Sequence, residues 1–200
     1  MADLQQEKGL VLDFLNNIDK AENKLLAETI SKYTSDDFHM RCTHPFNELK
    51  GADNVANDLW IPIKNSFKPI QRRMDIFYAG TNLIDNHSSK WVVNMGHLLG
   101  IFNNPFLGIV PTRKAVMLWY CEFYRVENNK ITEGAFFLDI LKFMQQLQLP
   151  IIPESTGMVG FNPGPMTHDG LYFNKQPEEE GQKTLDLMMR MANRLVGGGM

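Results

Sequence analysis

The sequence has few of the features that mark a metal-binding, secreted or membrane-spanning protein. It contains only two cysteines in 200 residues, Cys42 and Cys121, and no Cys/His set has the spacing of a metal site. One disulfide is arithmetically possible, but two thiols in a chain of this size are more typical of reduced packing residues in the cytoplasm. No run of about 18 apolar residues is present, and the polar N-terminus lacks the apolar core of a secretory signal. We therefore expect a cytoplasmic protein with no membrane partner and no metal.

An excess of positive charge is also missing. The chain has 20 Lys and Arg residues against 23 Asp and Glu residues, a formal net charge of −3, so no basic field favours nucleic acid. It contains no Gly-rich phosphate loop, no serine elbow and no recognisable setting for a cysteine nucleophile. The composition is 44% hydrophobic and 22% charged, which is ordinary for a globular protein with a sizeable core.

The hydrophobic pattern predicts helices followed by strands. Apolar residues recur at steps of three and four over residues 4–31, with a possible break at Asp19 or Asn23, and a second helix is predicted after Gly51. From Arg72 onward the hydrophobic pattern repeats every two residues, as expected of strands. The turn "ENNK" joins two of these strands into a long hairpin. This order predicts an α+β fold, in which N-terminal helices pack on one face of a curved antiparallel sheet that forms a cone with an interior pocket.

The last quarter of the chain differs in composition. Prolines and glycines punctuate residues 150–177, which predicts an arm or a long surface loop, and a final amphipathic helix follows. We therefore divide the chain into a cone domain, residues 1–149, and a Pro/Gly-rich arm with a C-terminal helix, residues 150–200.

Asp139 is the first candidate for chemistry, because it follows the apolar run "AFFL" and precedes "IL". A carboxylate in such surroundings loses water and resists ionising unless something compensates for the loss. One interpretation is an acid/base group in an apolar pocket. The other is a strand end, at which Asp139 caps the following helix or pairs with a nearby arginine.

His97 is the second candidate. Its strand face also carries Trp91, Val93, Met95 and Leu99, so it is either a satisfied core or rim residue or a hydrogen-bond donor in the same pocket. Tyr120, Glu122 and Tyr124 alternate on one face of a later strand, but the pattern does not decide which face lines the pocket. For a hydrophobic ligand in the cone we predict contacts with five aromatic side chains: Trp60, Phe77, Trp119, Tyr120 and Phe137.

Four stretches in order give the middle of the chain a family resemblance. They are "DIFYAG", "KWVVNMGHLLGIF", "FLGIVPTRKAV" and "FYRVENNKITEGAFFLDILKFMQQLQ". Together, from about Leu10 to Gln148, they resemble the SnoaL-like polyketide cyclases of the nuclear-transport-factor-two-like superfamily. The resemblance implies a cone of antiparallel sheet with three helices, usually a homodimer, and cofactor-free aldol ring closure.

The resemblance also implies roles for both candidates. Asp139 falls on the family's catalytic acid/base, which abstracts a proton next to a carbonyl, and His97 matches a pocket-lining histidine. Several positions depart from the pattern: Asn129 replaces the turn glycine, Ala135 an expected Trp, Arg113 a loop Gly and Val110 a loop Pro. Losing the Trp enlarges or reshapes the pocket, so the ligand need not be a polycyclic ester.

Three hypotheses follow. The first is a cofactor-independent enzyme of the SnoaL type that performs aldol cyclisation or isomerisation on a small hydrophobic ligand. The second is a non-catalytic ligand-binding or dimerisation module, because the same fold serves both purposes. The third is an epoxide hydrolase, which requires two acids and an arginine grouped around a water molecule.

Overall fold

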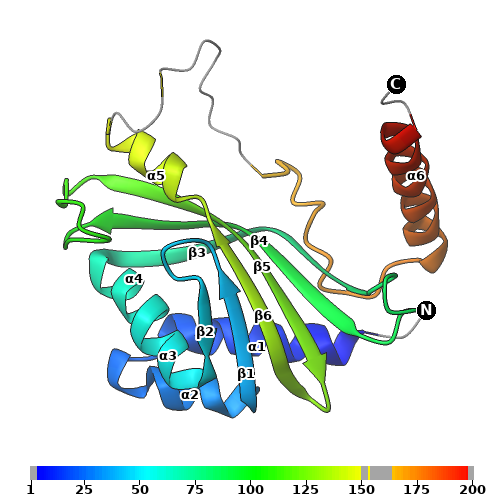
Figure 1. Ribbon diagram of the computed structural model, residues 1–200, viewed down its shortest axis with the longest axis horizontal. Helices are drawn as coiled ribbons and strands as arrows, with labels where there is room; N and C mark the ends of the chain where they lie inside the picture. Colours follow the sequence, from blue (N-terminus) through cyan, green and yellow to red (C-terminus); the bar gives the residue numbers. More distant parts are fainter. Residues whose placement is uncertain (1–3, 150–152, 154–163, 198–200) are drawn as a thin grey trace.

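The computed structural model describes residues 4–149, 153 and 164–197. Helices α1–α4 lie together on one side of a curved, open sheet, and helix α6 stands apart from the body (Figure 1). The predicted α+β class is confirmed. Most of the predicted arm between residues 150 and 163 lies outside the described residues.

The N-terminal helical pattern forms two helices joined by a single turn. Helix α1 spans Gln5–Lys20, a 3-10 turn (η1) spans Asn23–Leu25, and α2 spans Leu26–Tyr33. The sequence predicts a break at Asp19 or Asn23, and the structure places it between Lys20 and Leu26. The buried side of α1 carries an apolar stripe at steps of three and four, the pattern expected of a helix that covers a sheet: Val11, Phe14, Leu15 and Ile18.

The second helical segment is continuous but not uniform. It runs through α3 (Gly51–Asn54), a wider π-type turn (η2, Val55–Trp60) and α4 (Ile61–Ser66), with Pro62 tolerated in the first turn of α4. The widened turn ends at Trp60, which is buried and only 2% exposed. From its sequence Asp53 is a plausible N-cap for this segment, but the helix already begins at Gly51, so Asp53 lies in its first turn.

The sheet has six strands in the order β2-β1-β6-β5-β4-β3. Its strands are β1 (Thr34–Cys42), β2 (Glu48–Lys50), β3 (Phe67–Thr81), β4 (Lys90–Phe102), β5 (Ala115–Glu127) and β6 (Lys130–Leu138). All neighbours are antiparallel except β1 and β6, which run parallel. The predicted hairpin is β5–β6, and its turn residues Asn128 and Asn129 both have positive φ, which asparagine tolerates well.

The two faces of the sheet are distinguished by burial. On β5 the buried residues alternate, and Tyr120 and Tyr124 are among them, so their face points toward the helices. Directly opposite residues share a face, which places Asn94 beside Glu122 and Gly96 beside Tyr120 on this inner side. The other, outer face includes Met95 and Phe137, which are 43% and 51% exposed.

The C-terminal part follows the edge of the sheet before leaving it. Helix α5 spans Ile140–Gln146, and α6 spans Glu178–Gly197. Leu171 pairs in parallel with Phe77: Phe77 N donates to Gly170 O at 2.8 Å and Tyr172 N to Phe77 O at 2.7 Å. This pairing covers part of the free edge of β3. Among the described helices, none is long and apolar enough to cross a membrane.

Gly96 offers a direct test of the register of β3 and β4. A bulge between Met74 and Ile76 brings the β3 backbone so close that a Cβ at Gly96 would overlap the carbonyl oxygen of Arg73. We expect Gly96→Ala to lower the free energy of unfolding by about 2 kcal/mol or more, since backbone must move. Gly80→Ala, where a Cβ meets nothing within 4 Å, is the matched control. Equal urea midpoints for the two variants would show that the register is different.

Candidate functional site

A buried ion cluster lies on the inner face of the sheet, and the guanidinium of Arg72 is its centre. Arg72 Nη1 donates to both carboxylate oxygens of Glu122 at 2.9 and 3.0 Å. On its other edge, Nε and Nη2 donate to the two oxygens of Asp19 at 2.9 and 3.2 Å. The side chains of Arg72 and Glu122 are 3% and 0% exposed, whereas that of Asp19 is 34% exposed. One cation therefore holds two carboxylates, of which only Asp19 reaches solvent.

Aromatic and amide groups complete the cluster. The Arg72 Cζ lies 5.2 Å from the ring centroid of Trp60 and 5.0 Å from that of Tyr120, at cation–π distance. Asn94 Nδ2 donates to Glu122 Oε2 at 2.9 Å and to the Tyr120 hydroxyl at 3.1 Å. These contacts fix the guanidinium plane and the Glu122 carboxylate in one arrangement.

Burial and neighbouring charges shift the pKa values of Arg72 and Glu122 in opposite directions. Burial by itself would lower the pKa of Arg72, but the charges of Glu122 and Asp19 raise it well above its ordinary value. Burial raises the pKa of Glu122, and the hydrogen bonds and charge of Arg72 and Asn94 only partly offset that effect. Burial also raises the pKa of Tyr120. Arg72 is thus permanently charged, and the ionised form of Glu122 depends on it.

Lys64 holds the end of α1 that carries Asp19. Its ammonium donates to the carbonyl oxygens of Ile18 and Ala21 at 2.7 and 2.6 Å, at the end of α1, where helix carbonyls lack partners within the helix. Burial lowers the pKa of Lys64, and the charge of Asp19 opposes that shift. The α4 lysine therefore anchors the last turn of α1, which carries the Asp19 carboxylate to Arg72.

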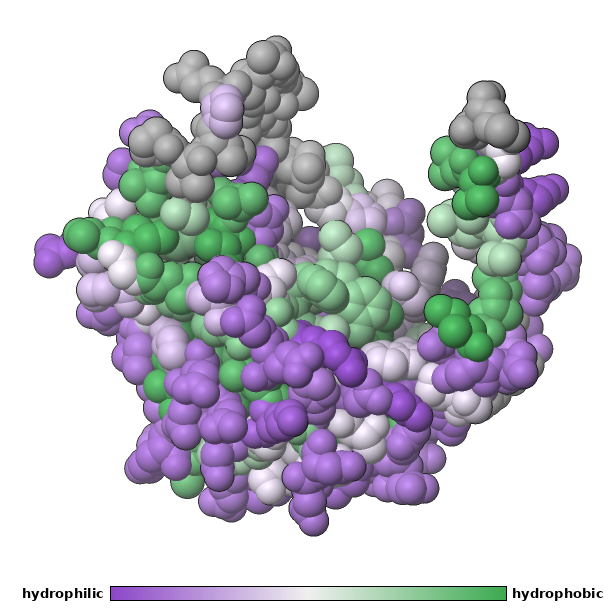
Figure 2. All heavy atoms as spheres, viewed as in Figure 1, coloured by the Kyte–Doolittle hydropathy of each residue, from purple (hydrophilic) through white to green (hydrophobic). Residues whose placement is uncertain are grey.

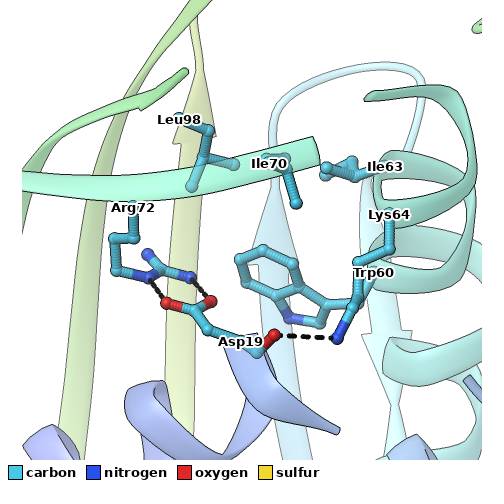
Figure 3. A pocket seen from close by; sticks show the side chains of 7 residues that line it. All are labelled: Asp19, Trp60, Ile63, Lys64, Ile70, Arg72 and Leu98. Atoms are coloured by element: carbon cyan, nitrogen blue, oxygen red, sulfur yellow. Dashed lines mark hydrogen bonds and ion pairs between the residues drawn. The ribbon is translucent and has the colours of Figure 1, made fainter. Parts of the chain in front are cut away.

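A small cavity adjoins the exposed side of this cluster (Figure 3). It measures about 20 Å³, enough for one water molecule, and it is lined by Asp19, Trp60, Ile63, Lys64, Ile70, Arg72 and Leu98. Within the described residues, the indole Nε1 of Trp60 is buried without a hydrogen-bond partner, as are Asn94 Oδ1 and the Tyr124 hydroxyl. Buried polar atoms without partners are uncommon, so a wet or ligand-binding interior is favoured here.

The structure does not place Asp139 in this interior. Asp139 is exposed, and its Oδ1 accepts the backbone N–H of Lys142 at 2.8 Å, so it is the N-cap of α5. The expectation of a carboxyl enclosed in an apolar pocket is wrong, and the capping interpretation is confirmed. The physical reason is local: α5 begins at the next residue, and its free N–H groups attract the carboxylate.

His97 lies on the outer face. Its Nδ1 is 3.4 Å from Asp75 Oδ2, and its ring centroid is 6.1 Å from that of Trp119. Trp119 and Phe137 belong to the same outer face, since Trp119 lies opposite His97 and Phe137 is half exposed. The expectation that these three line the interior pocket is therefore wrong, because the alternation of each strand turns them away from the helices.

The other three predicted ligand contacts are interior. Trp60 lines the cavity, Tyr120 stacks on Arg72, and Phe77 is fully buried. Phe77 packs against Phe173 with ring centroids 5.3 Å apart, so it belongs to the core and not to the cavity wall. Sequence reasoning missed Arg72, Asp19, Asn94 and Lys64, although a glutamate in the middle of a strand, Glu122, was a signal that a buried cation lies nearby.

The described residues contain no group of three or more His, Cys, Asp or Glu side chains that could hold a metal ion. Both cysteines are free thiols. Burial raises the pKa of Cys42 to about 12 and that of Cys121 above its ordinary value, which keeps both protonated at neutral pH.

Comparison with known proteins gives fold relatives only. No family model matches the sequence, and no curated protein matches it. Among solved structures, AclR, a candidate hydroxylase from Streptomyces galilaeus, is 20% identical, with a TM-score of 0.59 over 76% of this chain and 91% of that chain. The protein has the cone fold of the SnoaL-like and nuclear-transport-factor-two-like proteins.

Two further structures support the same fold. A candidate polyketide cyclase from Acidithiobacillus ferrooxidans is 16% identical, with a TM-score of 0.57 over 74% of this chain and 98% of that chain. A SnoaL-like candidate cyclase from Shewanella denitrificans OS-217 is 14% identical, with a TM-score of 0.55 over the same shares. The predicted SnoaL-like resemblance is confirmed as a fold, and the chemistry has to be argued from the residues of this chain.

The buried ion cluster predicts a pH-dependent stability for Arg72→Met. This variant leaves Glu122 buried without its cation, so the folded-state pKa of Glu122 lies above that of the unfolded chain, about 4.3. As the pH rises, the unfolded chain loses this proton first. The variant should therefore lose up to about 1.4 kcal/mol of stability for each pH unit between roughly pH 5 and pH 8.

Urea unfolding at several pH values measures this loss. Arg73→Met is the matched control, because Arg73 is exposed and donates only to Gln71 among the described residues. It should stay within about 0.5 kcal/mol of the unsubstituted protein. A pH-independent loss in Arg72→Met would contradict the ion pair with Glu122.

Proposed function

We propose that the protein is a cofactor-independent enzyme that adds water to a small apolar electrophile, such as an epoxide, at the cavity beside Asp19 and Arg72. The observation that supports it is the cluster itself: two carboxylates grouped around one arginine, next to a cavity with room for one water molecule. This is the third of the sequence hypotheses, with Asp19 and Glu122 in place of Asp139.

Asp19 has the properties of a general base in this reaction. It lines the cavity and is partly exposed, and each of its carboxylate oxygens has lone pairs beyond the one that Arg72 occupies. In the proposed step, Asp19 takes a proton from the water as the water oxygen bonds to an epoxide carbon. The C–O bond of the ring breaks, and the new alkoxide takes the proton back from Asp19, which gives a vicinal diol.

Arg72 stabilises the negative charge that develops on the ring oxygen. A fixed cation in a buried site acts strongly on such charge, because little bulk solvent screens it. Glu122 acts through Arg72 as a positioning residue: it does not line the cavity, but it holds the guanidinium from the far side.

The walls restrict the substrate. Ile63, Ile70 and Leu98 offer apolar contact, and the cavity itself holds no more than a water molecule, so the organic part of the substrate must enter from the exposed side of Asp19. A small apolar compound fits this arrangement better than a polyketide chain. Aldol or isomerase chemistry at Asp139 stays a prediction that the exposed position of that side chain does not favour.

A non-catalytic binding or dimerisation module is the second candidate. It is favoured by the outer sheet face, on which Tyr78, Met95 and Phe137 are each at least 40% exposed. Exposed apolar area of this kind on a sheet marks a contact surface more often than a catalytic one.

The proposed function is tested with small apolar epoxides in ¹⁸O-labelled water. The unsubstituted protein should form diols that carry one ¹⁸O atom. Asp19→Asn should lower kcat/KM at least about 100-fold, the usual contribution of a general base. Asp139→Asn, the matched control, should stay within about threefold, since the Asp139 side chain caps α5 and asparagine can do the same.

Circular dichroism establishes that both variants fold. No diol from the unsubstituted protein across the epoxide panel would refute the hydrolytic proposal. If Asp139→Asn lost activity and Asp19→Asn kept it, Asp139 and not Asp19 would be the catalytic carboxylate.

A further inference from the structure

The indole N–H of Trp60 is a buried hydrogen-bond donor beside the cavity. Trp60 is only 2% exposed, and its Nε1 has no hydrogen-bond partner among the described residues. The same side chain lines the cavity, and Figure 3 shows the indole nitrogen on the edge of the ring turned toward Asp19. Because a buried tryptophan N–H usually has a partner, this donor indicates that a polar group binds in the cavity.

Packing fixes the direction of this N–H group. The Arg72 Cζ lies 5.2 Å from the centroid of the Trp60 ring, and the Phe136 ring packs against the same side chain with centroids 5.3 Å apart. Trp60 is also the last residue of the π-type turn η2, and turns of this kind are rare and often occur at functional sites. The indole therefore cannot turn its N–H toward another partner without disturbing Arg72.

The two cations that line the cavity are already engaged. The Lys64 ammonium has three N–H groups, and three backbone carbonyl oxygens at the end of α1 accept hydrogen bonds from it at 2.7, 3.3 and 2.6 Å. Arg72 donates from all three of its side-chain nitrogens to Glu122 and Asp19. The ionised Asp19 carboxylate can only accept hydrogen bonds. Among the described polar groups of the cavity wall, the Trp60 indole is thus the donor that no other group engages.

We infer that the Trp60 indole N–H binds and orients the water that attacks the epoxide, an inference that rests on the proposed function. The cavity of about 20 Å³ has room for one water molecule. One lone pair of this water accepts the Trp60 N–H, and one of its protons is donated to Asp19. The second lone pair stays available to form the bond to the epoxide carbon.

The surroundings favour water as the bound group. Asp19 is 34% exposed, so solvent can reach the cavity beside it. The surface over α1–α4 is mainly hydrophilic in the view of Figure 2, which does not favour a large apolar ligand near these helices. Trp60 and Asp19 therefore meet opposite sides of the hydrogen-bonding capacity of water, one as donor and one as acceptor.

An isosteric tryptophan analogue tests this role with little change in packing. In β-(3-benzothienyl)alanine a sulfur atom replaces the indole N–H, so the analogue at position 60 keeps the ring beside Arg72 and removes the donor. We expect kcat for epoxide hydrolysis to fall at least about tenfold with little change in KM, since the water loses its orientation while the substrate contacts remain.

The same analogue at Trp91 is the matched control, because the Trp91 Nε1 donates to Ser89 Oγ at 2.9 Å and not to the cavity. It should leave kcat unchanged, and circular dichroism establishes that both proteins fold. Equal kcat values for the two substituted proteins would overturn the inference.

A second measurement needs no activity. In protein labelled with ¹⁵N-tryptophan, the Trp60 indole proton should show a nuclear Overhauser effect to a long-lived water, and the signal is assigned by its absence when the analogue occupies position 60. An active enzyme without this water signal would overturn the inference and leave the proposed function in place. A water signal without any diol would instead refute the proposed function, and with it the catalytic role of the water at Trp60.

Discussion

The burial of one arginine governs the interior of this protein. A guanidinium that is 3% exposed loses most of its hydration, which costs several kcal/mol unless other groups replace the water. Here Glu122 and Asp19 take its two edges, and Trp60 and Tyr120 take its faces. These partners come from β5, α1 and η2, so the ion cluster also fixes how the helices sit on the sheet.

The same cluster forms the proposed catalytic site. Asp19 is at the end of α1, where the helix stops and its side chain reaches both Arg72 and solvent, and Lys64 holds that helix end by its carbonyls. A partly exposed carboxylate, a fixed cation and a cavity with room for a water molecule are thus brought together by residues that are far apart in the chain. Glu122, buried behind the cation, keeps it in place without meeting the cavity.

The sequence predicts the elements better than the site. Hydrophobic residues that recur with periods of 3.6 and 2 residues locate α1, the β5–β6 hairpin and the curved sheet, because these patterns are local. The sequence does not decide which face of β5 points inward, because both faces carry aromatic residues. The structure places Tyr120 and Tyr124 inside and Trp119 and Phe123 outside. Asp139 has apolar neighbours in the sequence but not in space. Successive residues of a strand point to opposite faces, and a helix begins directly after Asp139. The pairing of Arg72 with Asp19 depends on tertiary contact, which no spacing reveals.

Side-chain ¹⁵N NMR of the arginines tests the buried cluster most directly. A guanidinium bound on both edges rotates slowly about its Cζ–N bonds, and its protons exchange slowly with water. We expect one arginine with separate, slowly exchanging Nη protons at neutral pH, and this set of signals should disappear in Arg72→Met and persist in Arg73→Met. Averaged, fast-exchanging Nη signals for every arginine, or a slow set that survives in Arg72→Met, would contradict this expectation.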